Sequence, residues 1–530
     1  MSKQNNHSDK QIKSPISFFA SKSSIGSYAI FFFWVLLALN LIAAAWYVLH
    51  GDLHFQTDIA RDFLILAEIE QKKLILIGAR AGAAGLFHGV FWPYFNFPAY
   101  FIGNGNPVVV AWWWIVCSLV FMWYSFRIAK RLFNQLTAYL YVLLTSAYLV
   151  FQTKEFTHPQ GAMLLVPGVF YMFWQYIQTL KPRYLVLFVL GAGLLIQLEM
   201  AFGMPFFILA ALYILVKQIQ QKKFYHVFTF LLILIPLSTF IIFDIRHDFF
   251  LTKSYLAYVK GQPWETYNFA RILQNRLDYM TTLGAPLLYS MFTFGEGNLN
   301  RLFFVVFFAV LIWVIARGER RLLYLTFLYF FLGYFIFSLT NRYYLLSQHF
   351  IAFVPMVLMF FVSLVTTKNG KVLAPFILFI LIFNVYAGFM FMTDAKTFIG
   401  KNEDSWKVLA QIANDIYAQT GEEFGYFVYA PDKFAYEPKY AMVYGQKQHP
   451  QKQAYYFQKK PVTYVVSAPP PPNNPFMHDE WWTVNSIKID KTPQSVFNYP
   501  NGYKVERYKL TPEEITVPWD RQEDSGLHFR

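Results

Sequence analysis

The sequence contains almost no cysteine and few charged residues for its length. Among 530 residues there is one cysteine, Cys117, and 14% of residues are charged, against about 25% in a typical soluble protein. A single cysteine excludes an outer domain held together by disulfides. No small-residue cleavage site follows the long polar N-terminal lead, which argues against a cleavable secretory signal.

Apolar and aromatic residues are abundant instead. Hydrophobic residues make up 56% of the chain and aromatic residues 21%, including 59 phenylalanines, and they gather in long runs. This pattern is typical of a polytopic α-helical membrane protein. It predicts about 11 transmembrane helices, several of them near the lower limit of roughly 17 residues for a spanning helix. The predicted spans are 27–49, 107–125, 136–152, 160–180, 184–199, 202–217, 227–243, 302–316, 322–339, 349–365 and 372–392. Spans 184–199 and 202–217 should form a hairpin that turns near Gly203 and Pro205.

The positions of the basic residues predict how the chain is oriented. The net charge is +14, and most cations fall in the same alternate segments between the predicted spans. The short segments on the other side hold only Lys154 and Arg342. Because Lys and Arg near span ends face the cytoplasm, the sequence predicts a cytoplasmic N-terminal tail (1–26), a transmembrane domain (27–392) and an outer C-terminal domain (393–530). The basic excess is thus a topology signal, and nucleic-acid binding is not expected.

The last 138 residues, counted from 393 to 530, have the ordinary polar and proline content of a small globular domain. Helical spacing of apolar residues predicts a helix over 404–420. Short β-rich runs predict strands, and together these elements indicate a small α/β domain outside the membrane. The predicted strands are 424–430, 462–468, 483–489 and 503–510.

The first outer loop (50–106) is the most informative segment. Asp58, Arg61 and Asp62 have the spacing i, i+3 and i+4, so a helix over 58–70 would place all three on one face. Two carboxylates around one guanidinium could hold an ionised base or a divalent cation. An ordinary helix start explains them equally well, with Asp58 as the cap and Arg61 paired with Asp62 at the surface.

Further along this loop, residues 78–89 contain four glycines together with Arg80 and His88. Glycine permits close approach of a ligand, and arginine can contact phosphate; a flexible loop accounts for the glycines as well. The aromatic run 91–101 suits an interfacial belt or the wall of a groove for a prenyl chain or sugar.

Other polar residues fall near the predicted outer edge of the membrane. Charge at membrane depth is costly and usually functional, although each residue alone also suits an interface anchor. Their agreement in depth predicts a shared substrate-binding pocket with Arg61, Arg80 and His88. The residues near the predicted outer edge are Glu155, His158, Glu199, Arg246, His247, Arg342, Tyr343 and Tyr344.

Several motifs, in order, resemble the GT-C glycosyltransferases. The nearest likeness is to the bacterial branch related to protein O-mannosyltransferases and the aminoarabinose transferase of lipid A modification. It is carried by "TDIARDFLILAEI" (57–69), "LIGARAGAAGLFHGVFWPYFNFPAYFIGNGNP" (76–107), "FTHPQG" (156–161), "GLLIQLEM" (193–200), "FDIRHDFFLTKSYL" (243–256) and "YEPKYAMVYG" (436–445).

The resemblance implies a glycosyltransferase that moves a sugar from a polyprenyl-phosphate carrier to a lipid, glycan or protein of the cell envelope. It maps the family's first-loop Asp, a base or metal contact, onto Asp58. Many members have Glu at the next position, where this chain has Ile59, which makes Asp62 the nearest substitute. The resemblance leaves the cofactor open, with a divalent cation at Asp58 as one candidate. Arg80, Arg246 and Arg342 are the candidates for the lipid phosphate.

The implied location is the bacterial cytoplasmic (inner) membrane, with membrane lipids as neighbours. Three alternatives remain open from the sequence. A flippase or transporter for the same lipids would place ionisable groups near the membrane midplane, in duplicated halves. An O-antigen-type polymerase or ligase would use a diphosphate carrier. A receptor-like scaffold would use the C-terminal domain for binding.

Overall fold

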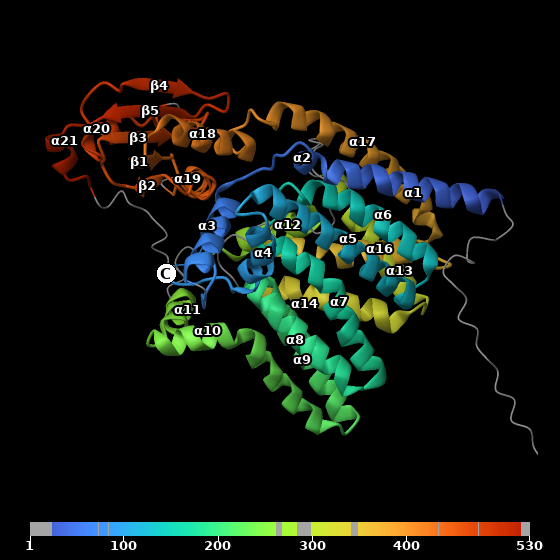
Figure 1. Cartoon of the computed structure of the whole chain (residues 1–530). Helices are drawn as coiled ribbons and strands as arrows, with labels where there is room; N and C mark the ends of the chain where they lie inside the picture. The colour runs from blue at the N-terminus through green and yellow to red at the C-terminus, as the bar shows by residue number, and fades with distance from the viewer. Residues whose placement is uncertain are drawn as a thin grey trace, which may run out of the picture.

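The computed structural model describes residues 24–72, 74–82, 84–260, 268–282, 298–340, 348–432, 434–474 and 476–520. Every predicted span coincides with a helix or a pair of consecutive helices, and these helices pack side by side in one bundle (Figure 1). They are α1 (Ser24–Ala44), α5 (Pro107–Leu132), α6 (Gln135–Gln152), α7 (His158–Thr179), α8 (Pro182–Leu198), α9 (Met200–Gln220), η2 (Phe224–Ile233) with α10 (Leu234–Arg246), α13 (Asn298–Ala316), α14 (Arg321–Ser338), α15 (Gln348–Ile351) with α16 (Val354–Val365), and η4 (Gly370–Leu373) with α17 (Ala374–Phe398).

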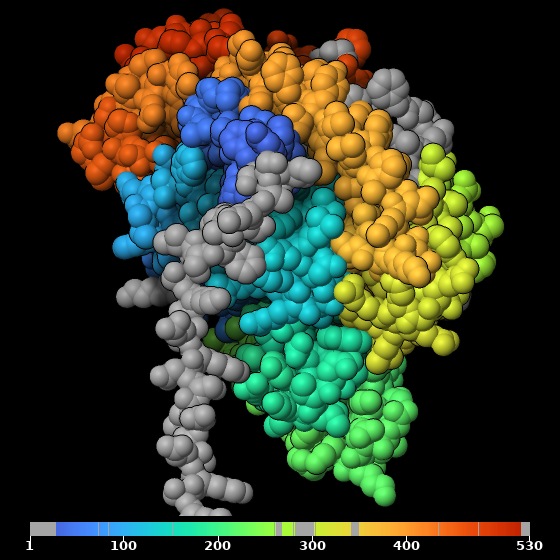
Figure 2. All heavy atoms as spheres, turned by 90° about the vertical axis from the view of Figure 1, so that its right-hand side faces the viewer, coloured from blue at the N-terminus to red at the C-terminus, as the bar shows by residue number. Residues whose placement is uncertain are grey.

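Five of these segments are long and apolar enough to cross a membrane: α5, α9, η2 with α10, α14, and η4 with α17. Their lipid-facing side chains stay exposed; only 11% of the most apolar window of η2–α10 is buried inside the protein. In Figure 2, α1 and α17 lie side by side along the bundle, although they stand at opposite ends of the transmembrane sequence. The chain is a multi-pass membrane protein, and the exact number of crossings stays a prediction.

The predicted hairpin over 184–217 is present, but its turn is not where the glycine and proline indicated. The chain reverses at Glu199, the single residue between α8 and α9. Gly203 lies inside α9, where a Cβ would come within 2.5 Å of the backbone nitrogen of Ile196. The glycine thus allows the two helices to approach closely below the turn.

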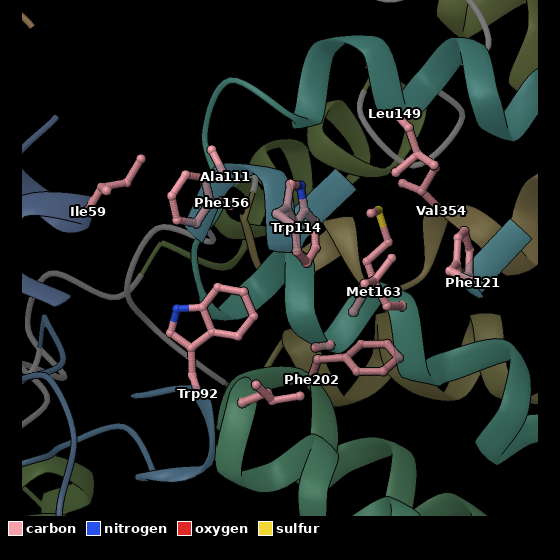
Figure 3. Packing of buried hydrophobic residues seen from close by; sticks show 14 of the residues in the cluster. Ile59, Trp92, Ala111, Trp114, Phe121, Leu149, Phe156, Met163, Phe202 and Val354 are labelled. Carbon is pink, nitrogen blue, oxygen red and sulfur yellow. The ribbon is translucent and has the colours of Figure 1, made fainter. Parts of the chain in front are cut away.

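Shorter helices cover one end of the bundle. They are α2 (Trp46–Leu49), α3 (Thr57–Lys72), α4 (Phe91–Ile102), α11 (Phe250–Lys260) and α12 (Phe269–Thr282). The apolar stripe of α3 is buried, with Ile59, Phe63 and Leu66 each at most 2% exposed. Figure 3 shows Ile59 near Trp92 of α4 and Phe156, so α3 is held at the end of the bundle by its apolar face.

The C-terminal domain is α/β, as predicted. Its elements are α18 (Trp406–Gln419), β1 (Glu423–Tyr429), α19 (Tyr436–Gln448), β2 (Gln453–Tyr456), β3 (Val462–Ser467), α20 (Glu480–Asn485), β4 (Ser495–Asn498), β5 (Lys504–Lys509) and α21 (Pro512–Thr516). The five-stranded sheet has the order β2-β1-β3-β5-β4, with β1 parallel to β2 and β3, and β5 antiparallel to β3 and β4.

One predicted strand, 483–489, is wrong. Its first residues belong to α20, where the Thr483 amide donates to the Asp479 carbonyl over 2.8 Å in a helical turn. The strand β4 lies further on and pairs with β5.

The C-terminal domain is fixed to the segment 50–106, the predicted first outer loop. Asp52 is fully buried and accepts hydrogen bonds from the Ser405 hydroxyl (2.6 Å) and from the Gly400 and Lys407 amides (3.0 and 3.1 Å). Helix α19 packs against α3. Figure 1 shows this domain and α3 at the end of the bundle opposite to the start of α1.

Candidate active site

The first turn of α3 carries the central ion pair. Helix α3 begins at Thr57, so Asp58 lies where the helix dipole favours a carboxylate. Arg61 Nη1 lies 2.8 Å from Asp58 Oδ1, one turn further along. The Arg61 side chain is only 13% exposed, whereas that of Asp58 is 49% exposed. Asp58 therefore presents a carboxylate oxygen to solvent, while Arg61 is anchored in the protein.

Asp62 lies on the inner side of the same guanidinium. Its side chain is buried, Arg61 Nη2 lies 3.6 Å from Oδ1, and the Trp92 indole donates to Oδ2 over 3.1 Å. Burial raises the pKa of Asp62 to about 6, although Arg61 and Trp92 oppose that increase. The interpretation of Asp62 as a surface partner of Arg61 is wrong, because α4 covers this carboxylate.

The glycine-rich segment 78–89 forms a short hairpin. The Gly78 amide donates to the His88 carbonyl over 2.9 Å, and the Gly89 amide donates to the Gln197 carbonyl over 2.9 Å. A Cβ at Gly89 would lie 1.8 Å from Gln197 Oε1. Glycine is therefore required here because the hairpin touches the end of α8.

The hairpin brings His88 against the start of α7. The rings of His88 and His158 lie 3.8 Å apart. His158 Nδ1 lies 2.8 Å from the Leu198 carbonyl and 3.6 Å from Glu199 Oε2, and Glu199 is buried. Burial and the charge of Arg61 lower the pKa of His88 to about 3, so this ring is neutral at pH 7. Three predicted site residues thus meet near Arg61.

A second group joins three distant parts of the chain. His54 Nδ1 lies 3.1 Å from Glu155, and its Nε2 lies 2.9 Å from Asp404 at the start of the C-terminal domain. Burial alone would lower the pKa of His54, but the bonds to Asp404 and Glu155 outweigh it and raise the pKa to about 9. His54 is therefore a cation at neutral pH, and we name this group the His54 bridge.

The start of α19 forms a wall beside Asp58. The Thr57 hydroxyl donates to Glu437 Oε1 over 2.5 Å. Burial raises the pKa of Tyr436, while the charges of Arg61 and Arg80 lower it, which places both arginines within electrostatic range of this ring. Arg80 itself is exposed. The start of α19 and Arg80 of the hairpin thus both lie near the Asp58–Arg61 pair.

The remaining predicted residues lie at the end of α10 or outside the described part. Arg246 and His247 end α10, where the His247 ring stacks on Phe243 at 4.0 Å. Among the described residues, neither makes a hydrogen bond or ion pair to Asp58, Arg61 or Asp62. Arg342, Tyr343 and Tyr344 lie outside the described residues.

Sequence reasoning missed several residues of this region. His54, Trp92 and Glu437 bind partners far away in the sequence, so no local spacing reveals them. Arg276 on α12 is fully buried and donates to the Ser338 carbonyl over 3.2 Å. The sequence could have pointed to Arg276, because an arginine on a helix near the membrane is costly to bury.

The described donors near Asp58 do not fit a divalent cation. In the part of the chain that the structure describes, no three His, Cys, Asp or Glu side chains cluster to hold a metal ion. Asp58 Oδ1 is paired with a guanidinium, and Asp62 faces Trp92.

Two comparisons with known proteins agree with this architecture. Residues 88–243 match the family model of dolichyl-phosphate-mannose–protein mannosyltransferases. The fold is similar to the crystal structure of ArnT from Cupriavidus metallidurans bound to undecaprenyl phosphate, with a TM-score of 0.59 and 12% identity over 94% of this chain and 100% of that one. The apo ArnT structure from the same organism gives a TM-score of 0.57 and 11% identity over 92% and 98%. No curated protein matches the sequence significantly.

The chain therefore shares the fold of the ArnT structures, and residues 88–243 within it match the mannosyltransferase family model. The resemblance seen in the sequence motifs is confirmed, including the likeness to the lipid A aminoarabinose transferase.

Proposed function

We propose that this protein transfers a sugar from a polyprenyl-phosphate carrier to an acceptor of the cell envelope, at the outer face of the membrane. Two findings support the donor class: the match to a family that uses a lipid-phosphate sugar, and the fold shared with an ArnT structure that holds undecaprenyl phosphate. The acceptor is a lipid, glycan or protein with a free hydroxyl. The sugar is a hexose or pentose, and transfer inverts its anomeric carbon.

The observation that carries the proposal is the exposure of Asp58 beside the largely buried guanidinium of Arg61. A half-exposed carboxylate next to an anchored guanidinium supplies a proton acceptor and a positive charge within one helical turn. Transfer of a group from a phosphate requires a general base for the acceptor's proton and a positive charge that stabilises the leaving phosphate.

In the proposed reaction, the acceptor oxygen attacks the anomeric carbon while its proton passes to Asp58. The bond between that carbon and the phosphate oxygen breaks, and polyprenyl phosphate leaves as an anion. Arg61 and Arg80 stabilise the departing charge. Asp62 positions Arg61 from the inner side, held in turn by Trp92.

The other site residues have proposed supporting roles. His88, His158 and Glu199 line the inner side of the site, and Glu155 supports it through the His54 bridge. Binding of the lipid carrier at the outer edge is proposed for Arg246, His247, Arg342, Tyr343 and Tyr344. Only the family resemblance implies a divalent cation at Asp58, and the proposed reaction does not use one.

The orientation proposed for the inner membrane has the N-terminus in the cytoplasm and the C-terminal domain outside. Reporter fusions after residue 26 and after residue 400 test it. We expect only the second fusion to show the activity of an exported reporter.

The function is tested by purified protein in proteoliposomes. The donors are a panel of undecaprenyl-monophosphate hexoses and pentoses, and in parallel the corresponding diphosphates. The acceptor is an envelope extract from a strain lacking the protein. We expect transfer from a monophosphate donor, seen by mass spectrometry as a modified acceptor and free undecaprenyl phosphate. Transfer from diphosphate donors only, or lipid crossing without a new glycosidic bond, would overturn the proposal.

A further inference from the structure

The turn that leads into α19 exposes an aromatic ring beside the proposed catalytic carboxylate. Phe434 is 46% exposed, and its ring stacks on Tyr436 with centroids 5.3 Å apart. Tyr436 lies within the electrostatic range of Asp58, Arg61 and Arg80. The free face of Phe434 therefore lies at the margin of the site and belongs to the C-terminal domain, whereas the catalytic pair belongs to the first outer loop.

The turn is held in one shape. Asp432 Oδ1 accepts from the Phe434 amide (2.9 Å) and the Ala435 amide (3.0 Å). Ala435 has φ +49°, a left-handed conformation that is unfavourable for a residue with a Cβ. Such strain persists only where the surroundings fix it. The turn is thus built to hold Phe434 in place.

Polar groups around the ring complete the chemistry. Within the described residues, Asp432 Oδ2 has only a long contact, 3.4 Å, from the Thr57 hydroxyl, and Asp432 is exposed. The half-exposed carboxylate of Asp58 follows Thr57 directly. An aromatic face suits the apolar C–H face of a sugar ring, and carboxylates accept hydrogen bonds from its hydroxyls.

We propose that Phe434 and Asp432 form the acceptor subsite, and that the acceptor is a carbohydrate whose ring stacks on Phe434 while a hydroxyl points to Asp58. This inference rests on the proposed transferase function and names the substrate class that it acts on. It also gives the C-terminal domain a role: it binds the acceptor, while the first outer loop and the bundle bind the donor.

The matched pair of variants is Phe434→Ala and Phe476→Ala. Phe476 is an exposed phenylalanine of the same domain (85% exposed). Among the described residues, no contact links it to Asp58, Arg61 or Asp62. Transfer is measured with the undecaprenyl-monophosphate donor that supports the wild type and with the envelope extract of the deletion strain. Initial rates are taken while the donor and the extract are varied separately.

For Phe434→Ala, we expect the apparent KM for the extract to rise about three- to tenfold, the cost of one aromatic contact. The KM for the donor should be unchanged. Phe434→Tyr should restore the wild-type value, and Phe476→Ala should have no effect. Asp432→Asn keeps an oxygen for the turn and should raise only the KM for the extract.

An unchanged KM for the extract in Phe434→Ala, while the wild type transfers sugar, would overturn the subsite and leave the transferase function standing. So would a rise in the donor KM alone, or transfer by the wild type only to acceptors that carry no sugar. If the wild type transfers no sugar from any donor, the proposed function fails first.

Discussion

The indole nitrogen of Trp92 donates to Asp62 Oδ2 over 3.1 Å and thereby ties the aromatic helix α4 to the acidic face of α3. Asp62 in turn lies behind Arg61, and Arg61 holds Asp58. Trp92, which also suits an interfacial aromatic belt, thus supports the proposed base Asp58 through Asp62 and Arg61.

Replacing Trp92 with Phe should shift the pH dependence of transfer. Asp62 is ionised above its pKa of about 6, and only its charged form holds Arg61 electrostatically. Loss of a hydrogen bond worth about 1 kcal/mol to the charged form would raise this pKa by about 0.7 units. The acid limb of kcat against pH should therefore move upward by about that amount. A limb that stays in place would show that Asp62 does not control the rate.

The His54 bridge should make stability depend on pH in the alkaline range. The pKa of His54 is raised to about 9 in the folded protein, from 6.5. The protonated form therefore stabilises the fold fully below pH 6.5, and this stabilisation is lost as the pH rises through 9. In thermal unfolding of detergent-solubilised protein, His54→Gln should lower Tm at pH 6.5 relative to wild type. The difference should shrink by pH 10; a constant difference would contradict the charged bridge.

Two glycine substitutions test the packing of the hairpin. Gly89→Ala places a Cβ 1.8 Å from Gln197 Oε1, whereas a Cβ at Gly82 meets nothing within 4 Å. Gly89→Ala should destabilise the protein by about 1–3 kcal/mol and reduce transfer, because His88 follows the hairpin backbone. Gly82→Ala is the control and should match wild type in both. Equal Tm values for the two variants would contradict this packing.

Chelation tests whether a divalent cation takes part. Because the described donors near Asp58 do not fit a metal site, incubation with EDTA followed by desalting should leave the initial rate of transfer unchanged. A loss of activity that Mg²⁺ or Mn²⁺ restores would show that a cation binds.

Much of the bundle follows from the sequence because apolar runs report directly on helices that face lipid. The spacing of Asp58, Arg61 and Asp62 likewise revealed one face of α3, since a helix repeats locally. Burial of Asp62 could not be predicted, because it depends on a helix that packs from outside this pattern. The His54 bridge was missed for a similar reason: its partners come from the α6–α7 connection and the C-terminal domain.

The errors in the C-terminal domain have a local cause. Strands β2 and β4 are only four residues long, too short to show a clear alternation. Residues 483–489 show β-type composition, yet the Asp479 carbonyl starts a helical turn there. The glycine and proline in α9 suggested a turn, but Gly203 serves helix contact instead.

The most direct test of the account is the rate of sugar transfer by Asp58→Asn. This change preserves the shape of the side chain and removes its ability to accept a proton. Measured with saturating undecaprenyl-monophosphate sugar and extract, kcat should fall about 100-fold or more, while Tm and the KM for the donor stay near wild type. A kcat equal to that of wild type, in protein folded to the same extent, would contradict the role of Asp58 as the base.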